Sequence, residues 1–301
     1  MIFFKSRLGR MLLALISVTL WGSAFAGAKI GFEYMPPIML SGLRFTLAGL
    51  LLVPVGFVMK IKWRELLANW RFIVFFGMIQ TVLQYGLFYT GLSYTPGSLA
   101  AIIIGAGPLF IAVMSHFTLS DDKLTWRNIS AFLIGVMGVV FISINPEESV
   151  AALNPHFYLG VALLILSNLV GSYTNIMVVK YKGVLSSVGL TMGANFTGGI
   201  ILFLISLFVE GTSSLEQSLP LEFYFALLWL AIIPAAAFSM WYYLLSLPDT
   251  KVSQLNIWKF LIPIVGVLMS WWLLPEDSPS WRAIVGIVVI TLSVLMYKRT
   301  K

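Results

Sequence analysis

The chain has 301 residues, of which 59% are hydrophobic and only 10% are charged, and it contains no cysteine. A soluble domain carries about 25% charged residues, so this composition excludes a single water-soluble core and indicates a polytopic membrane protein. The lack of cysteine excludes disulfides, thiolate metal sites and a cysteine nucleophile. The net charge of +7 comes from short basic loops between apolar runs, which sets membrane orientation and does not indicate a nucleic-acid partner.

The apolar runs predict an all-α membrane protein with ten transmembrane helices in a lipid bilayer. Each run has close to the roughly 20 residues that cross a bilayer, and none alternates as a barrel strand would. The runs cover residues 10–31, 37–59, 71–92, 97–118, 127–145, 157–180, 186–209, 221–245, 251–273 and 281–298. Turn sequences such as Thr95-Pro96-Gly97 and Leu247-Pro248-Asp249 separate them.

Basic residues gather on one side of this predicted layer. They lie at the two ends of the chain and in alternate connectors, as Lys5, Arg7, Arg10, Lys60, Lys62, Arg64, Lys180, Lys182, Lys298, Arg299 and Lys301. The other connectors are mainly acidic, with Glu147, Glu148, Glu210 and Glu216. Because basic loops stay in the cytoplasm, both termini are predicted to be cytoplasmic.

The chain contains an internal repeat. Sliding it by 155 positions places Leu92–Arg127 on Leu247–Arg282 without a gap, and pairs Pro108 with Pro263 and Trp126 with Trp281. Shared apolarity alone does not easily produce such matches. The repeat predicts two units, residues 1–150 and 151–301, of five helices each. Because five is odd, the second unit is inverted in the membrane, which is a transporter signature that expects a substrate site at mid-depth between the halves.

Several segments resemble the EamA-type branch of the drug/metabolite transporter superfamily. They are "LWGSAFAGAKIG" near the start, "YTPGSLAAIIIGAGPLFIAVMSHFTLSDDKLTW" in the first half and "VSQLNIWKFLIPIVGVLMSWWLLPEDSPSW" in the second. The resemblance covers essentially the whole chain and implies a transporter of the bacterial inner membrane, often an exporter of amino acids or related small molecules. The family often has Gly-Glu after the fourth and ninth helices, where this chain has Ser120-Asp121 and Pro275-Glu276. The resemblance implies a cavity and does not identify the substrate.

Two cations at membrane depth are the leading candidates for substrate binding. Arg44 and Lys259 lie within apolar runs that contain no acidic partner. A charge at the centre of a membrane helix costs about 2.5–3.5 kcal/mol on insertion scales, so the missing partner is predicted to be a carboxylate or another anion of the substrate. The alternative is that both side chains snorkel to headgroups or helix ends.

Polar and aromatic residues of the predicted spans could complete a cavity. The candidates are Gln80, Gln84, Tyr85, Trp21, Asn168, Asn195, Tyr242 and Trp258, and four-residue spacing is expected to put both glutamines on one helix face. Pro108 and Pro263 are predicted hinges, because proline removes a backbone donor and kinks a helix. The alternatives are helix glue for the polar groups, interfacial belts for the aromatic ones and tolerated kinks for the prolines.

The sequence contains no recognisable motif for nucleotide binding or metal binding. "GSAFAGAK" lacks the Gly-Lys-Ser/Thr ending of a phosphate loop, and neither histidine has a partner at metal-ligand spacing. We therefore expect no enzyme activity, metal or cofactor. The predicted function is alternating-access transport of small metabolites such as amino acids or related carboxylates, as an exporter, by a monomer or weak homodimer. An amphipathic-drug exporter and a carrier for uptake of a nucleotide-like metabolite are the alternatives, and a channel or lipid scramblase is less expected.

Overall fold

A computed structural model of the chain describes residues 6–119, 154–248, 250–275 and 281–298, with isolated residues between 126 and 138 and residue 279. The described residues form helices and no strand. Seven of their helices are long and apolar enough to cross a membrane, and two shorter apolar helices cover Trp258–Leu273 and Trp281–Ser293. The all-helical membrane prediction is therefore confirmed. The predicted fifth span, 127–145, lies largely outside the described residues, so the count of ten stays a prediction.

In the first half of the chain, turn and cap residues set where the helices begin. The elements are α2 (Arg7–Phe32), α3 (Pro37–Val58), α4 (Trp63–Ala68), α5 (Trp70–Gly77), the π-helix η1 (Met78–Leu83), α6 (Gln84–Ser93), α7 (Gly97–Gly105) and α8 (Gly107–Thr118). Ser6 caps α2 by accepting the Gly9 N–H at 3.1 Å. Proline at the first position starts α3 because its missing N–H would be unpaired there anyway.

The second half follows the same rules. Its elements are α10 (Phe157–Lys180), α11 (Ser187–Val209), the 3-10 turn η3 (Ser213–Leu215), α12 (Leu221–Ser246), α13 (Val252–Asn256), the 3-10 turn η4 (Ile257–Phe260), α14 (Leu261–Leu273) and α15 (Trp281–Lys298). Ser186 caps α11 through the Gly189 N–H at 3.1 Å. The capped and proline-started helices match the predicted runs to within a few residues.

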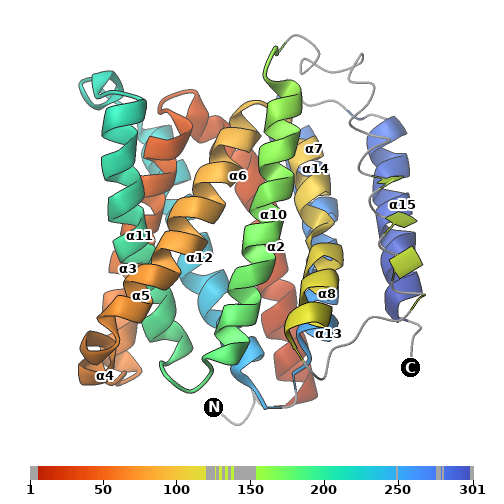
Figure 1. Ribbon diagram of the computed structural model, residues 1–301. Helices are drawn as coiled ribbons and strands as arrows, with labels where there is room; N and C mark the ends of the chain where they lie inside the picture. Colours follow the sequence, from red (N-terminus) through yellow and green to blue (C-terminus); the bar gives the residue numbers. More distant parts are fainter. Residues whose placement is uncertain are drawn as a thin grey trace.

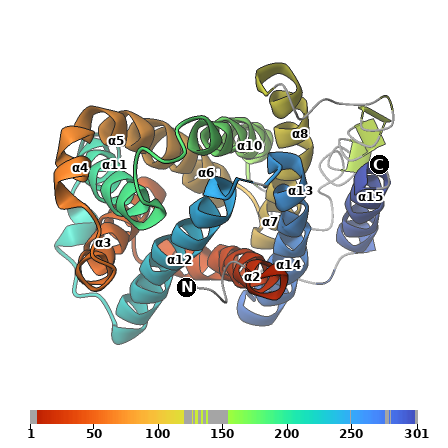
Figure 2. The same cartoon turned by 90° about the horizontal axis from the view of Figure 1, so that it is seen from below.

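Helices of the two halves pack against each other across one shared core. Helix α2 packs on α12 and α14, α3 on α11, α6 on α10, and α7 on α14. The views along and across the helix axes show these pairs side by side (Figures 1 and 2). In Figure 1, α4 and the connector from α10 to α11 lie on the side at which α2 begins and α15 ends. The two sequence units are thus interleaved in space and do not form separate bodies.

The pair α3 and α11 makes the closest backbone contact. A Cβ atom on Gly42 would lie 2.5 Å from the Phe203 nitrogen, and one on Gly199 would lie 2.3 Å from the Thr46 nitrogen. Only glycine allows backbones to approach so closely, as in the small-residue contacts of membrane helices. This pair, which we call the frame, consists of two helices that are continuous from end to end.

Three of the predicted spans are irregular near their middle. The third contains the π-helix η1 between α5 and α6. The fourth breaks between α7 and α8, with Pro108 in the first turn of α8, and the ninth passes through the 3-10 turn η4 just before Pro263 in α14. A Cβ on Gly105, at the end of α7, would lie 2.4 Å from the Pro263 ring. We call α7–α8 and α13–η4–α14 the interrupted pair, and its two breaks lie against each other.

Candidate binding cavity

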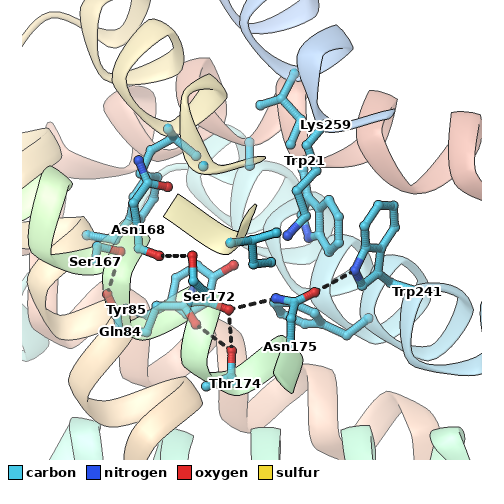
Figure 3. Close-up of a pocket in the computed structure, with 18 of the residues that line it drawn as sticks. Trp21, Gln84, Tyr85, Ser167, Asn168, Ser172, Thr174, Asn175, Trp241 and Lys259 are labelled. Carbon is cyan, nitrogen blue, oxygen red and sulfur yellow. Dashed lines mark hydrogen bonds between the residues drawn. The ribbon is translucent and has the colours of Figure 1, made fainter. Parts of the chain in front are cut away.

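A cavity lies in the core, lined mainly by α2, α6, α10 and α12, with Arg44 from the frame and several residues from the interrupted pair. Its empty space is about 840 Å³, a volume that includes open solvent at its mouth. The described residues that line it come from both halves of the chain (Figure 3). They are Trp21, Ala24, Phe25, Arg44, Gln84, Tyr85, Phe88, Ile104, Gly107, Ile111, Ser167, Asn168, Gly171, Ser172, Thr174, Asn175, Phe238, Trp241, Tyr242, Lys259 and Ile262.

Lys259 reaches the cavity between two indole rings. Its Nζ lies 5.0 Å from the ring centre of Trp241 and 5.4 Å from that of Trp21, which is cation–π distance. The rings themselves meet edge to face with centres 5.1 Å apart. The Trp241 indole N–H donates to Oδ1 of Asn175 at 2.9 Å, which fixes the ring that covers the ammonium. Figure 3 shows Lys259, Trp21 and Trp241 together on one side of the cavity.

Arg44 enters the same cavity from the frame. It is only 2% exposed, and its guanidinium donates to the Tyr89 hydroxyl. The guanidinium carbon lies 4.8 Å from the ring centre of Phe45 and 5.9 Å from that of Tyr85. Its Nε has no hydrogen-bond partner in the described structure. Aromatic faces and one hydroxyl therefore hold this cation, and no carboxylate of the described residues lies within ion-pair distance of Arg44 or Lys259.

The side of the cavity opposite Lys259 carries amides and hydroxyls from α10 and α6 (Figure 3). Asn168 Nδ2 donates at 2.7 Å to the carbonyl of Ile103, in the last turn of α7. This carbonyl, just before the break in that helix, also accepts the Ala106 N–H at 3.1 Å. Ser167 Oγ donates to the Gln84 backbone carbonyl at 3.0 Å, and Thr174 Oγ1 lies 3.5 Å from Oε1 of Gln84. The polar wall thus links α10 to both irregular spans of the first half.

Seven of the ten predicted binding residues lie on the cavity wall. They are Arg44, Lys259, Gln84, Tyr85, Trp21, Asn168 and Tyr242. Of the predicted hinges, Pro108 follows the break between α7 and α8, and Pro263 follows η4. Both cations are brought to one cavity although their helices are 215 positions apart in sequence, from Arg44 to Lys259.

Gln80, Asn195 and Trp258 do not line the cavity. The third span passes through the π-helix η1 (Met78–Leu83) just before Gln84, and of the two glutamines Gln84 lines the cavity and Gln80 does not. Gln80 Oε1 instead accepts from Thr81 at 3.1 Å, and Thr81 also reaches the Ala194 carbonyl of α11. Trp258 adjoins Lys259, and neighbouring residues of a helix point in directions about 100° apart or more.

The sequence interpretation missed Trp241, Asn175 and several small polar residues of α10. Ser167, Asn168, Ser172, Thr174 and Asn175 form the polar run of an otherwise apolar span, and that run was a usable signal. Trp241 gave no such signal, because its partner Asn175 is on another helix. The bond between them depends on how α10 and α12 pack.

Taken together, the fold and the cavity define a helical membrane protein with a cationic, aromatic-lined cavity between helices from both halves of the chain. The EamA-like transporter family matches residues 9–144 and 158–298, and the chain belongs to this family of membrane transporters.

Curated relatives span almost the whole chain. An uncharacterized transporter of Bacillus subtilis, YvbV, is 25% identical over 95% of this chain and 90% of its own length. A probable amino-acid metabolite efflux pump of Escherichia coli is 24% identical over 93% of this chain and 91% of its own, and one of Salmonella typhimurium is 26% identical over 92% and 91%. A protein of known crystal structure has the same fold, with a TM-score of 0.73 at 19% identity over 97% of this chain and 98% of that one.

Proposed function

We propose that this chain exports small metabolites, amino acids or related carboxylates, across the bacterial inner membrane. The observation that carries the proposal is that Arg44 and Lys259 line one cavity and have no carboxylate partner among the described residues. A buried charge without a counter-ion is costly. An anionic substrate would supply the counter-ion in its bound state.

Such pairing would also drive a conformational cycle. A ligand shifts an equilibrium only through its different affinity for the two states. A carboxylate that bridges the frame and the interrupted pair would favour the state in which both cations lie close to it. Substrate occupancy would therefore bias alternating access around the cavity.

We further propose that the chain has ten spans in two inverted five-helix repeats, one in residues 1–150 and one in 151–301. Two pairs of wall positions support the repeat, because Ile104 and Lys259 are separated by 155 positions, as are Gly107 and Ile262. The family matches two stretches of similar length. Interrupted helices at the site, one from each proposed repeat, are typical of inverted-repeat carriers.

The export direction and the substrate class draw on two relatives that are named as probable amino-acid metabolite efflux pumps. The mixture of cations, amides and aromatic rings in the cavity supports a small carboxylate as the substrate. A permanently open channel is less well supported, because channels do not need a charged site that binds one molecule. We propose that the chain works as a monomer or weak homodimer.

Transport by purified protein in liposomes tests the function. We expect saturable counterflow of at least one labelled carboxylate or amino acid in a metabolite panel. Lys259→Gln and Arg44→Gln each keep polarity and remove charge, and each should raise the half-saturation concentration by at least about tenfold, which is 1.4 kcal/mol. Lys251→Gln is the matched control, because Lys251 is an exposed cation just before α13. Wild-type kinetics in both cavity variants would contradict the proposal, and non-saturating flux or lipid scrambling would indicate another class.

The proposed topology has both termini in the cytoplasm. The chain has no cysteine, so single cysteines can be introduced without a background. A cysteine at Glu216, between α11 and α12, should react with a membrane-impermeant maleimide in intact spheroplasts. A cysteine at Lys182, between α10 and α11, should react only after permeabilisation. The reverse pattern would invert the topology.

A further inference from the structure

The charge balance of the cavity narrows the substrate class. The described lining residues include two cations and no aspartate or glutamate. A zwitterion would bring an ammonium group into this site together with its carboxylate. The question is whether the wall offers that ammonium a place.

We infer that the cavity binds organic acids that have a carboxylate, a flat apolar body and no ammonium group, in preference to the corresponding α-amino acids. The inference rests on the proposed function and narrows its substrate class to net monoanions. It assigns the carboxylate to Lys259 and the flat body to the aromatic wall.

The surroundings of Lys259 favour contact with a carboxylate. Its ammonium group faces Trp21 and Trp241 at cation–π distance, and an ammonium has three donors that rings alone do not fill. No carboxylate of the described residues takes them. An α-ammonium is bonded to the carbon next to the carboxylate, so it would be held within a few bonds of Lys259. The two like charges would repel each other at that distance.

Two amide acceptors of the wall already have donors near them. Asn175 Oδ1 accepts from Trp241, and Gln84 Oε1 is within 3.5 Å of the Thr174 hydroxyl. The indole faces next to Lys259 are also engaged, because Trp21 and Trp241 face its ammonium group. Beside Lys259, an incoming ammonium would therefore meet a second cation, rings that this cation already faces and amide acceptors that already have donors.

The aromatic wall next to Lys259 is the reason to expect a substrate with a flat apolar body. Phe238 lies between Trp21 and Tyr242, with ring centres 5.3 Å from Trp21 and 5.4 Å from Tyr242. The Phe238 and Tyr242 rings are stacked at 27°. A flat ring can lie against these faces with offset or edge contacts. A short aliphatic acid would leave most of that surface uncovered.

Calorimetric titration of the detergent-purified protein with three matched probes tests the inference. The probes are 3-phenylpropanoate, L-phenylalanine and 2-phenylethylamine, which carry net charges of −1, 0 and +1 on the same phenyl-ethyl body. We expect 3-phenylpropanoate to bind at least about tenfold more tightly than L-phenylalanine, and we expect no measurable binding of 2-phenylethylamine. Butanoate, which lacks the ring, should bind more weakly than 3-phenylpropanoate.

Variants at Lys259 test whether the charge or the shape of this side chain determines the preference among the probes. Lys259→Arg keeps the cation and should keep the order of the probes. Lys259→Gln removes both the attraction and the repulsion, so the acid-to-amino-acid ratio should fall below about threefold. Lys251→Gln, the control outside the cavity, should leave the ratio unchanged. A melting temperature for each variant confirms that it is folded, and Lys259→Arg tests the charge even if Lys259→Gln is unstable.

The outcome also separates this inference from the transporter proposal. Counterflow of amino acids with equal or tighter binding than their ammonium-free analogues would overturn the inference and leave transport standing. Selective binding of 3-phenylpropanoate without counterflow of any metabolite would support the inference and contradict the transporter proposal. A wild-type ratio in Lys259→Gln would show that Lys259 does not bind the carboxylate.

Discussion

The frame and the interrupted pair each bring two helices into close contact, but the helices of the frame are continuous and those of the interrupted pair are broken. In the frame, glycines of α3 and α11 bring two continuous helices into backbone contact. In the interrupted pair, Gly105 also makes a close contact, but it meets the Pro263 ring where both helices are broken. Close contact between continuous helices opposes bending, whereas a break allows it. We interpret the frame as the rigid side of the cavity and the interrupted pair as its adjustable side.

Each of these two regions contains one of the two cations of the cavity. Arg44 belongs to the frame and is held by Tyr89 and the surrounding rings, whereas Lys259 belongs to the turn η4 of the interrupted pair. A carboxylate near both would contact a fixed cation and an adjustable one. This difference suggests that Arg44 positions the substrate and that Lys259 reports its presence to the broken helices.

The largest effect is expected in the frame. Gly199→Ala places a methyl group 2.3 Å from the Thr46 nitrogen, which is backbone and cannot rotate away. Overpacking of this kind costs about 1–3 kcal/mol and occasionally more, so we expect a clear fall in melting temperature and in the yield of monodisperse protein. Gly86→Ala is the control, because its nearest neighbour is the flexible Leu202 side chain at 3.6 Å. Equal stability of the two variants would show that the frame is not tightly packed.

An intermediate effect is expected in the interrupted pair, on transport more than on stability. Pro263→Ala restores a backbone N–H and lets the turn η4 continue as regular helix. Loss of a bend usually changes rate and apparent affinity together, so we expect counterflow to slow on the order of tenfold. Pro54→Ala is the matched control, because Pro54 is exposed inside the continuous helix α3. If both variants transport at wild-type rates, the break near Pro263 is a passive kink.

Sequence patterns predicted the frame better than the cavity. The apolar run 37–59 matches α3 (Pro37–Val58) because bilayer thickness fixes its length and prolines fix its start. The π-helix of the third span could not be read in the same way, because an extra residue in a turn depends on the packing of η1 against α11. Of the two predicted glutamines, Gln84 lines the cavity and Gln80 does not.

Cations were easier to predict than their surroundings. A lysine within an apolar run is conspicuous, so its position in the sequence alone predicted Lys259 as a candidate binding residue. The two rings around it come from α2 and α12, which are distant in the chain. Of these, Trp21 was predicted and Trp241 was not, because tryptophans are common in apolar spans and only tertiary packing shows which of them face a cavity.

The end of the frame offers a smaller effect. Glu210, just after α11, accepts the backbone N–H groups of Ile38 at 2.8 Å and Met39 at 2.7 Å, at the start of α3. These N–H groups have no partner within their own helix. Glu210→Ala should therefore lower stability by about 1 kcal/mol, as loss of a helix cap does. A thermal melt in detergent measures the change, and transport at room temperature should be nearly unaffected, because Glu210 does not line the cavity.

The smallest effect is the pH dependence of that same contact. Burial raises the pKa of the Glu210 carboxyl above its ordinary value of 4.5, and the two backbone N–H donors oppose the rise without cancelling it. A carboxyl whose pKa is higher in the folded state stabilises the fold when it is protonated. Its contribution is therefore complete below about pH 4.5 and is lost as the pH rises through the folded pKa.

Melting temperatures of the wild type and Glu210→Gln between pH 4 and 7 test this sign, since glutamine keeps an acceptor but does not titrate. The wild type should lose stability relative to Glu210→Gln as the pH rises. The opposite slope would mean that the start of α3 favours the carboxylate more than burial disfavours it. In that case the contact between Glu210 and the start of α3 would be stabilised by charge. The frame would then differ from the interrupted pair in electrostatics as well as in packing.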